Sequence, residues 1–400
     1  MTNWKTYKLG EIGRIVTGKT PKTSIQENFG GCIPFLTPSD DLSGKYSPST
    51  AKTLTQSGLR EVKNCLLPAN SICVSCIGSD LGKVVKLVLP TVTNQQFNSI
   101  IPNEGFDADF VYYLMTIVGR QLNYLSKTST AVPIINKTQF SNYEVQIPSL
   151  EEQRRIAGIL GAIDDKIELN RRINENLEQQ AQALFDNLMS NSNLTYKLIA
   201  DLDYIIETGR RPKGGVANIT SGVPSIGAEN IKGLGKYDYS KTKYVTAEFA
   251  EMMKKGVIKG YELLIYKDGG KPGYFIPNFS IFGEGFPYDD MTLNEHVFLL
   301  DFGNKGYNFF AYFYMQTEEV MKYLNAQGSK AAIPGINRND VESISIPTIE
   351  NKVVKEFCTM VEPIITSILV NSKESSRLAT LRDTLLPKMM NGELNIDGVR

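Results

Sequence analysis

A long run of regularly spaced apolar residues, between Pro148 and Ser190, most constrains how this chain can fold. Apolar side chains recur there at alternating steps of four and three: Ile156, Leu160, Ile163, Ile167, and then Leu177, Ala181, Leu184 and Leu188. This spacing is typical of the seam along which two helices pack. No proline interrupts the run, so it predicts one helix of about 40 residues, which spans about 60 Å at 1.5 Å per residue.

A second run of the same kind lies in the last fifth of the chain and offers the first helix a partner. Its seam comprises Val354, Phe357, Val361, Ile364, Ile368, Asn371, Ser375, Leu378, Arg382 and Leu385. Both runs become polar near their middle, where the first carries Asn170 and Asn174 and the second carries Asn371. Asparagines in a helical seam commonly fix its register. Either they face the opposite helix in that role, or they face solvent where the seam drifts.

The sequence outside these two runs is repeated. Residues 6–9 (TYKL) return as 195–198, and residues 17–22 (TGKTPK) return as 208–213 (TGRRPK). Residues 93–97 (TNQQF) correspond to 293–297 (LNEHV), and an Ile-Pro pair precedes each long run. The repeat predicts four parts, which are a first globular domain (1–148), a first helix (149–193), a second globular domain (194–347) and a second helix with a tail (348–400).

Each globular part reads as short strands separated by Gly, Pro, Ser and Asn turns, with one or two helices. Strands are predicted near 71–77, 84–89 and 263–266, and helices near 110–124 and 307–323. The predicted fold class is therefore α+β. Two mixed α/β domains are separated by two long antiparallel coiled-coil helices, and an internal repeat relates the two halves by an approximate two-fold axis.

Composition excludes several classes of protein. The 43 basic and 43 acidic residues cancel, although residues 1–148 hold 14 basic and 10 acidic side chains, an excess of +4. No apolar run reaches about 18 residues, and no basic leader precedes an apolar segment, so we expect a cytoplasmic protein without a membrane span. Five cysteines are an odd number, which favours reduced thiols over a disulfide framework.

The repeated Thr-Gly-basic-x-Pro-Lys loops are the most informative polar feature. Each puts cations on a glycine-hinged turn, where backbone can approach a phosphate and long side chains can reach a groove of DNA. The alternative is a solvated surface turn, which recurrence in both halves disfavours. The predicted DNA contacts are Lys19, Thr20 and Lys22 with Arg210, Arg211 and Lys213, and in second place Ser79, Lys83, Gln95, Gln96, Lys267, Lys271, Asn294 and Glu295.

Catalytic signatures are weak throughout the sequence. The Asn/Asp-Pro-Pro-aromatic element of an adenine methyltransferase is absent, and His296 is the only histidine, which removes most nucleophile-and-base arrangements. The pair Cys73 and Cys76 has no second pair and no neighbouring histidine, so a buried strand is favoured over a zinc site. We therefore expect neither a catalytic residue nor a bound metal or cofactor.

Three stretches carry a family resemblance: residues 147–156 (IPSLEEQRRI), 166–178 (KIELNRRINENLE) and 381–388 (LRDTLLPK). Together with the four-part order, they resemble the specificity subunit of type I restriction-modification enzymes. The resemblance implies a non-catalytic subunit in which two target-recognition domains each read half of a split, asymmetric DNA sequence. The paired helices then act as a ruler between the two domains.

The resemblance also implies protein partners. Two copies of an adenine-N6 methyltransferase subunit dock on the helices, and the assembly can further bind ATP-dependent restriction subunits. S-adenosylmethionine, ATP and Mg²⁺ are then expected on those partners only. The predicted docking residues are Arg154, Arg155, Lys166, Arg171 and Arg172. Alternatively, these residues are ordinary surface charges of a helix. A different class of function stays open, in which the paired helices form a scaffold that links two protein partners without nucleic acid.

Overall fold

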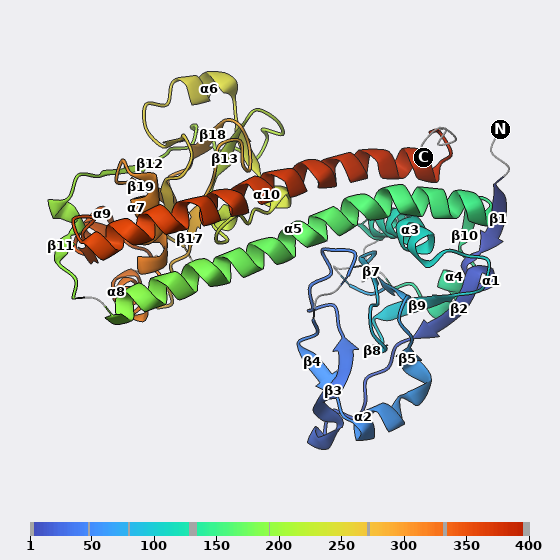
Figure 1. Cartoon of the computed structure of the whole chain (residues 1–400). Helices are drawn as coiled ribbons and strands as arrows, with labels where there is room; N and C mark the ends of the chain where they lie inside the picture. The colour runs from blue at the N-terminus through green and yellow to red at the C-terminus, as the bar shows by residue number, and fades with distance from the viewer. Residues whose placement is uncertain are drawn as a thin grey trace. The chain divides into compact units, whose positions relative to one another are not determined.

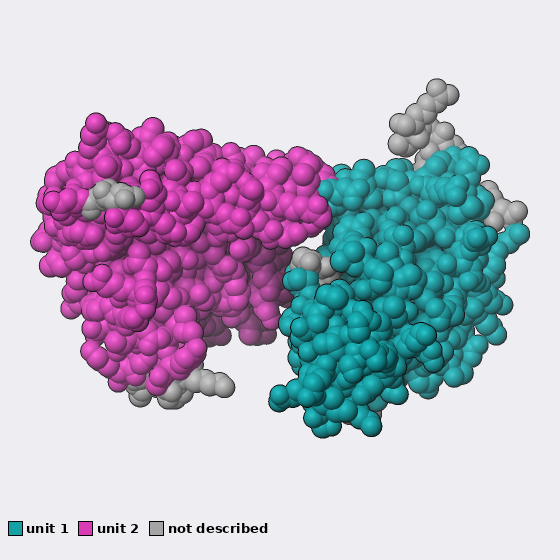
Figure 2. All heavy atoms as spheres, turned by 60° about the horizontal axis from the view of Figure 1, so that its bottom comes forward, with its two compact units in different colours: residues 1–165, 379–400 teal, residues 166–378 magenta. Residues whose placement is uncertain are grey.

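The computed structural model describes residues 4–46, 49–78, 81–127, 134–191, 193–269, 273–330 and 334–394. The chain forms two compact units (Figure 2): unit 1 contains residues 1–165 and 379–400, and unit 2 contains residues 166–378. Two long helices, α5 (Leu150–Asn191) and α10 (Lys352–Met390), contribute to both units, since each begins in one and ends in the other (Figure 1). None of the described helices carries an apolar stretch long enough to cross a bilayer.

The described residues of unit 1 form three small sheets. The first pairs β1 (Lys5–Lys8) with β10 (Glu144–Ile147). The second has the antiparallel order β2 (Gly13–Thr17), β9 (Phe97–Pro102), β6 (Ile72–Ser75), β7 (Val84–Lys86). The third has the order β4 (Lys52–Leu54), β3 (Phe29–Leu36), β8 (Thr91–Thr93), β5 (Leu66–Leu67), with β3 and β8 parallel. The helices are α1 (Leu9–Ile12), α2 (Gln56–Glu61), α3 (Ala108–Lys127) and α4 (Lys137–Ser141).

Unit 2 repeats this topology strand for strand. Here β11 (Tyr196–Leu198) pairs with β20 (Ser345–Pro347). The antiparallel sheet has the order β12 (Ile205–Thr208), β19 (Val297–Asp301), β16 (Leu263–Tyr266), β17 (Phe279–Ile281). The mixed sheet has the order β14 (Lys243–Val245), β13 (Val223–Ile226), β18 (Met291–Leu293), β15 (Val257–Ile258), and β13 and β18 are parallel. The helices are α6 (Ala247–Glu251), α7 (Lys305–Tyr314), α8 (Glu318–Gly328) and α9 (Arg338–Glu342).

The predicted mixed α/β class with two long helices is confirmed, and the repeat extends from sequence to strand order. One predicted helix differs, because residues 307–323 form two helices that are interrupted at 315–317. Thr317 adopts an extended backbone there, and two acidic residues in the next turn suit the positive end of a new helix. Cys73 and Cys76 are buried, as a core strand requires.

The seam asparagines face the opposite helix within unit 2. Asn170 is fully buried, and its amide donates to Glu374 Oε2 at 2.7 Å and to Ser375 Oγ at 3.2 Å. Asn371 in turn donates to Asn174 Oδ1 at 2.9 Å. Because these bonds form in only one alignment of the two helices, the arrangement favours the register role over solvent exposure.

A buried charge joins the same two helices within unit 1. Asp164 of α5 accepts hydrogen bonds from Arg382 Nη1 of α10 at 2.8 Å and from the Tyr113 hydroxyl of α3 at 2.6 Å. Burial and the charge of Asp164 raise the pKa of Tyr113, so its hydroxyl remains a donor. Leu386, Met389 and Met390 of α10 complete the apolar core around this contact.

We expect Asp164→Ala to lower the free energy of unfolding of the full chain by about 3–5 kcal/mol, because Arg382 then keeps a partly buried, unpaired charge. Glu318→Ala, which removes the exposed partner of Lys322, is the matched control and should leave the urea denaturation midpoint unchanged. Equal midpoints for both variants would show that the Asp164 contact adds nothing to stability.

Candidate nucleic-acid interface

In unit 1 the basic loop after β2 lies against the turn between β8 and β9. Gly18 N donates to Phe97 O at 3.1 Å, and Lys19 N donates to Thr93 O at 2.9 Å. A Cβ on Gly18 would lie 2.0 Å from the carbonyl oxygen of Asn94, so the two backbones can meet only at glycine. Thr20 Oγ1 then donates to Gln95 Oε1 at 2.7 Å. The structure thus brings two separately predicted residues together.

In unit 2 a glycine also packs on the equivalent turn, with a different backbone hydrogen bond and different side chains. Gly209 N donates to Asn294 O at 3.2 Å, and a Cβ on Gly209 would lie only 1.6 Å from Leu293 O. Arg211 Nε lies 2.7 Å from Glu295 Oε1, an ion pair that lacks the alignment of a hydrogen bond. Positions 211 and 295 therefore correspond to positions 20 and 95 of unit 1.

One asparagine holds the turn in each unit. Asn94 Oδ1 accepts a hydrogen bond from Gln96 N at 3.0 Å, and Asn294 Oδ1 accepts one from His296 N at 2.8 Å. Asn294 is only 3% exposed. Its burial and its bond within the turn suit a residue that positions the turn, and its predicted DNA contact stays a prediction.

The predicted lysines of unit 1 are exposed at the loop's outer side. Lys19 and Lys22 are both exposed. Lys22 N donates to Glu61 Oε2 at 2.9 Å, and this bond and one from the Asn28 amide hold the pKa of Glu61 below its usual range. The Glu61 carboxylate therefore fixes the loop backbone while the lysine side chains point to solvent.

Arg210 and Lys213 occupy the corresponding places in unit 2, and both are exposed. The Arg210 guanidinium lies 5.2 Å from the centre of the Phe249 ring and donates to Met252 O at 3.2 Å. These contacts with α6 and the residue after it hold a cation in place on the surface.

Sequence reasoning missed three lysines beside these loops. Lys254 and Lys255 are exposed and line a hollow with Arg210, while the next residue, Gly256, packs on the backbone of Gly209. In unit 1, Cys65 Sγ contacts Thr17 O at 3.5 Å and brings the exposed Lys63 to the equivalent position. Their place in the repeat could have revealed these lysines, since they lie just before the equivalent strands β5 and β15. The residues around them differ between the two halves of the chain, so the repeat is hard to recognise there.

The remaining predicted DNA contacts stay predictions. Gln96 lies in the turn and accepts from Asn94 Nδ2 at 2.9 Å, whereas Lys267 follows β16 and its Nζ donates to Glu295 O of the corresponding turn at 3.2 Å. Lys83 lines another hollow of unit 1. Ser79 and Lys271 lie outside the described residues.

Three of the five cations predicted to dock a partner already form ion pairs within the chain. Lys166 lies 3.2 Å from Glu374 of the opposite helix. Arg171 and Arg172 both pair with Glu168 at 2.7 Å, and these bonds lower the pKa of Glu168. Arg154 is exposed and Arg155 is half-buried. The docking role of all five stays a prediction.

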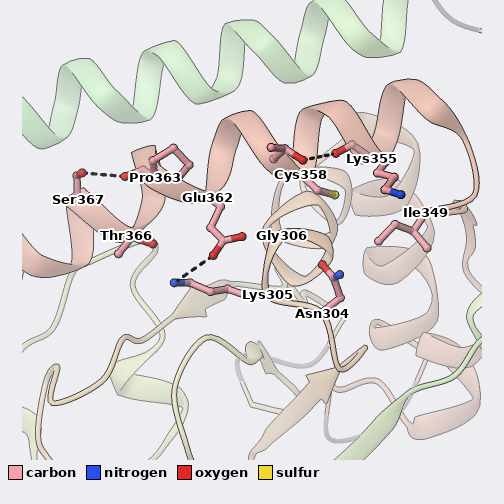
Figure 3. A pocket seen from close by; sticks show the side chains of 11 residues that line it. Asn304, Lys305, Gly306, Ile349, Lys355, Cys358, Glu362, Pro363, Thr366 and Ser367 are labelled. Carbon is pink, nitrogen blue, oxygen red and sulfur yellow. Dashed lines mark hydrogen bonds and ion pairs between the residues drawn. The ribbon is translucent and has the colours of Figure 1, made fainter.

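A groove lies elsewhere in unit 2, between the start of α7 and α10 (Figure 3). Lys305 faces Glu362 at 3.6 Å across it, and Ser367 Oγ donates to the carbonyl of Pro363 at 2.8 Å. None of the predicted residues lines this groove. Among the described residues, no group of three His, Cys, Asp or Glu side chains is arranged to hold a metal ion.

Comparisons with known proteins agree with this geometry. The family model of the type I restriction modification DNA specificity domain matches residues 1–179. The type I restriction enzyme MjaIX specificity subunit of Methanocaldococcus jannaschii is 26% identical over 418 residues, which cover 99% of this chain and 94% of that protein. The HindI specificity subunit of Haemophilus influenzae is 32% identical over 179 residues, 43% of this chain and 39% of that protein.

A solved structure resembles the whole chain. The crystal structure of a type I restriction-modification S subunit from M. genitalium covers 97% of this chain, and the match covers 96% of that structure, with a TM-score of 0.59. The two sequences are 15% identical, so the likeness is one of fold.

We expect Gly209→Ala to destabilise unit 2 by about 1–3 kcal/mol, because the new methyl group forces the loop away from the carbonyl of Leu293. Gly158→Ala is the control, since that helical glycine has open space around it and alanine favours helices. Thermal unfolding of the two variants measures the difference. A Gly209→Ala protein as stable as the wild type would contradict the close contact.

Proposed function

We propose that this chain, which is similar to the specificity subunits of type I restriction-modification enzymes, is the non-catalytic subunit that recognises a bipartite DNA sequence. The observation that carries the proposal is the loop and turn found in both units, where a glycine contact presents exposed cations. Each unit would contact one half-site of double-stranded DNA. Two copies of one surface on a single chain suit a target made of two parts.

The exposed cations supply contacts to phosphate. Lys19, Lys22 and Lys63 are exposed in unit 1, and Arg210, Lys213, Lys254 and Lys255 are exposed in unit 2. Cations that neutralise phosphates release bound counterions, which gives affinity without sequence preference. Since the net charge of the chain is zero, this affinity has to come from such local clusters.

The two half-sites should differ. The units share their strand order and the glycine contact, but the side chains that meet above it are Thr20 and Gln95 in one unit and Arg211 and Glu295 in the other. Sequence is read by side chains at base edges, whereas phosphate contacts fix position. Unlike side chains on a shared backbone therefore support an asymmetric target.

The chemistry would belong to partners. We propose that α5 and α10 dock two adenine-N6 methyltransferase subunits, with restriction subunits as a further partner, and that S-adenosylmethionine, ATP and Mg²⁺ bind to those proteins. The repeated architecture supports this stoichiometry, because two similar faces on one chain accept two identical partners. The docking candidates are Arg154, Arg155, Lys166, Arg171 and Arg172.

Replacing Lys254 and Lys255 by alanine should weaken DNA binding. The slope of log affinity against log salt concentration should also decrease in magnitude by about 2, because each lost phosphate contact removes about 0.9 from it. Lys322→Ala, which removes an exposed lysine of α8, is the matched control and should leave the slope unchanged. Fluorescence anisotropy with a labelled duplex at several salt concentrations measures both. An unchanged slope in the double variant would remove this hollow from the interface.

Replacing Arg171 and Arg172 by glutamate should abolish co-purification with the methyltransferase subunit, because both charges on the outer side of α5 are reversed. Arg338→Glu breaks a comparable surface ion pair on α9 and serves as the control for general charge effects. Retained co-purification of the Arg171/Arg172 variant would show that these residues are ordinary surface charges of the helix. Their ion pairs with Glu168 are compatible with that alternative.

A further inference from the structure

We propose that one pair of side chains in each unit selects one base pair of its half-site: Thr20 with Gln95 in unit 1, and Arg211 with Glu295 in unit 2. The inference rests on the proposed DNA-reading function and adds which residues discriminate between bases. The chemistry of the pairs assigns an A·T base pair to unit 1 and a G·C base pair to unit 2.

Backbone contacts show that the two pairs are equivalent. Thr17 pairs with Asn98 at the end of β2, and Thr208 pairs with Phe298 at the end of β12, so the loops leave their sheets in the same register. The next residue is a glycine that packs on the β8–β9 turn or on its counterpart between β18 and β19. Two residues further, the loop side chain meets the second residue of that turn in both units.

The surroundings of the two pairs differ in charge. Cys76 N donates to Gln96 O at 2.8 Å, and Lys267 N donates to His296 O at 2.9 Å, so these positions also correspond. An isolated β-bridge joins Ile77 to Ile134 in unit 1, and the corresponding bridge in unit 2 joins Asp268 to Gly335. Unit 1 therefore has the neutral residues Cys76, Ile77, Gln95 and Gln96 where unit 2 has Lys267, Asp268, Glu295 and His296.

The acidic side chains of unit 2 call for a specific partner. Glu295 and Asp268 lie on either side of the His296 ring, which contacts Asp268 through Nδ1 and lies 3.4 Å from Glu295 Oε1 through Nε2. Carboxylates at a DNA-binding surface repel phosphates, so attraction to the backbone does not account for them. Glu295 Oε2 is shielded from solvent and accepts no hydrogen bond, although a buried charged acceptor normally has a donor.

A G·C base pair supplies the complementary groups. The major-groove edge of guanine presents two acceptors, O6 and N7, and that of cytosine presents the N4 amino donor. The closest contact of Arg211 with Glu295 is through Nε, so the terminal nitrogens of the guanidinium can form the two-pronged contact with guanine. The Glu295 side chain is 42% exposed, so it can turn Oε2 out of its shielded position toward cytosine N4, and the acceptor then gains the donor that it lacks.

The pair in unit 1 matches an A·T base pair. Gln95 is exposed, and its Oε1 already accepts from the Thr20 hydroxyl, which fixes the orientation of the amide. A glutamine amide forms two hydrogen bonds with adenine N6 and N7, and a threonine methyl group contacts the thymine methyl group. Neither Thr20 nor Gln95 carries a charge. This pair therefore does not favour guanine, whereas Arg211 can do so by donating to both guanine acceptors.

Exchanging the pairs tests the assignment. The full-length wild-type chain, the R211T/E295Q variant and the T20R/Q95E variant are each used to select bound duplexes from a randomised DNA library, with Lys322→Ala as the control. We expect R211T/E295Q to change one position of one half-site from G·C to A·T by about tenfold or more. The T20R/Q95E variant should make the opposite change in the other half-site.

The possible outcomes separate the inference from the proposed function. If the wild-type chain enriches no sequence, the DNA-reading function itself fails, and the assignment fails with it. If the wild type enriches a bipartite sequence but the exchanged variants select it unchanged, or lose preference in both half-sites, the pairs only support the loops. Should R211T/E295Q fail to fold, T20R/Q95E decides alone, because its changes lie on a surface loop and turn.

Discussion

Each unit depends on a contact between two backbones that only glycine permits. At Gly18 and Gly209 a Cβ would come within 2.0 Å and 1.6 Å of a carbonyl oxygen, so the basic loop can lie directly on the neighbouring turn. This contact sets where the next four residues project. The cations and the base-reading candidates of each unit are therefore placed by backbone geometry, and the side chains remain free to differ.

That separation would let one architecture serve the two half-sites that we propose. The strand order, the glycine contact and the asparagine that holds the turn recur in both units. The side chains above them do not, since a neutral hydrogen-bonded pair in unit 1 is replaced by an ion pair within a charged cluster in unit 2. If these side chains read DNA as proposed, a change of target would require only a few surface substitutions, because the buried contacts that position them would stay unchanged.

The sequence predicted what depends on local pattern and missed what depends on tertiary contact. The heptad spacing located α5 within two residues, and alternating turns and apolar runs located strands such as β16. Helix α7 ends before the predicted end at residue 323 because Thr317 begins a new helix. The apolar residues on both sides of Thr317 made the segment look like one helix. The pairing of Arg211 with Glu295, and the approach of Lys254 and Lys255 to Arg210, join residues that are distant in sequence, so no spacing rule reveals them.

The contribution of α10 to unit 1 has a consequence for biosynthesis. Leu386, Met389 and Met390 fill the same core as Leu9, Phe110 and Leu160. A ribosome delivers those late residues only after all of unit 2 has been made, whereas unit 2 is complete in the nascent chain by residue 378. The unit that emerges first is therefore finished last, and until then its exposed apolar surface needs protection from aggregation.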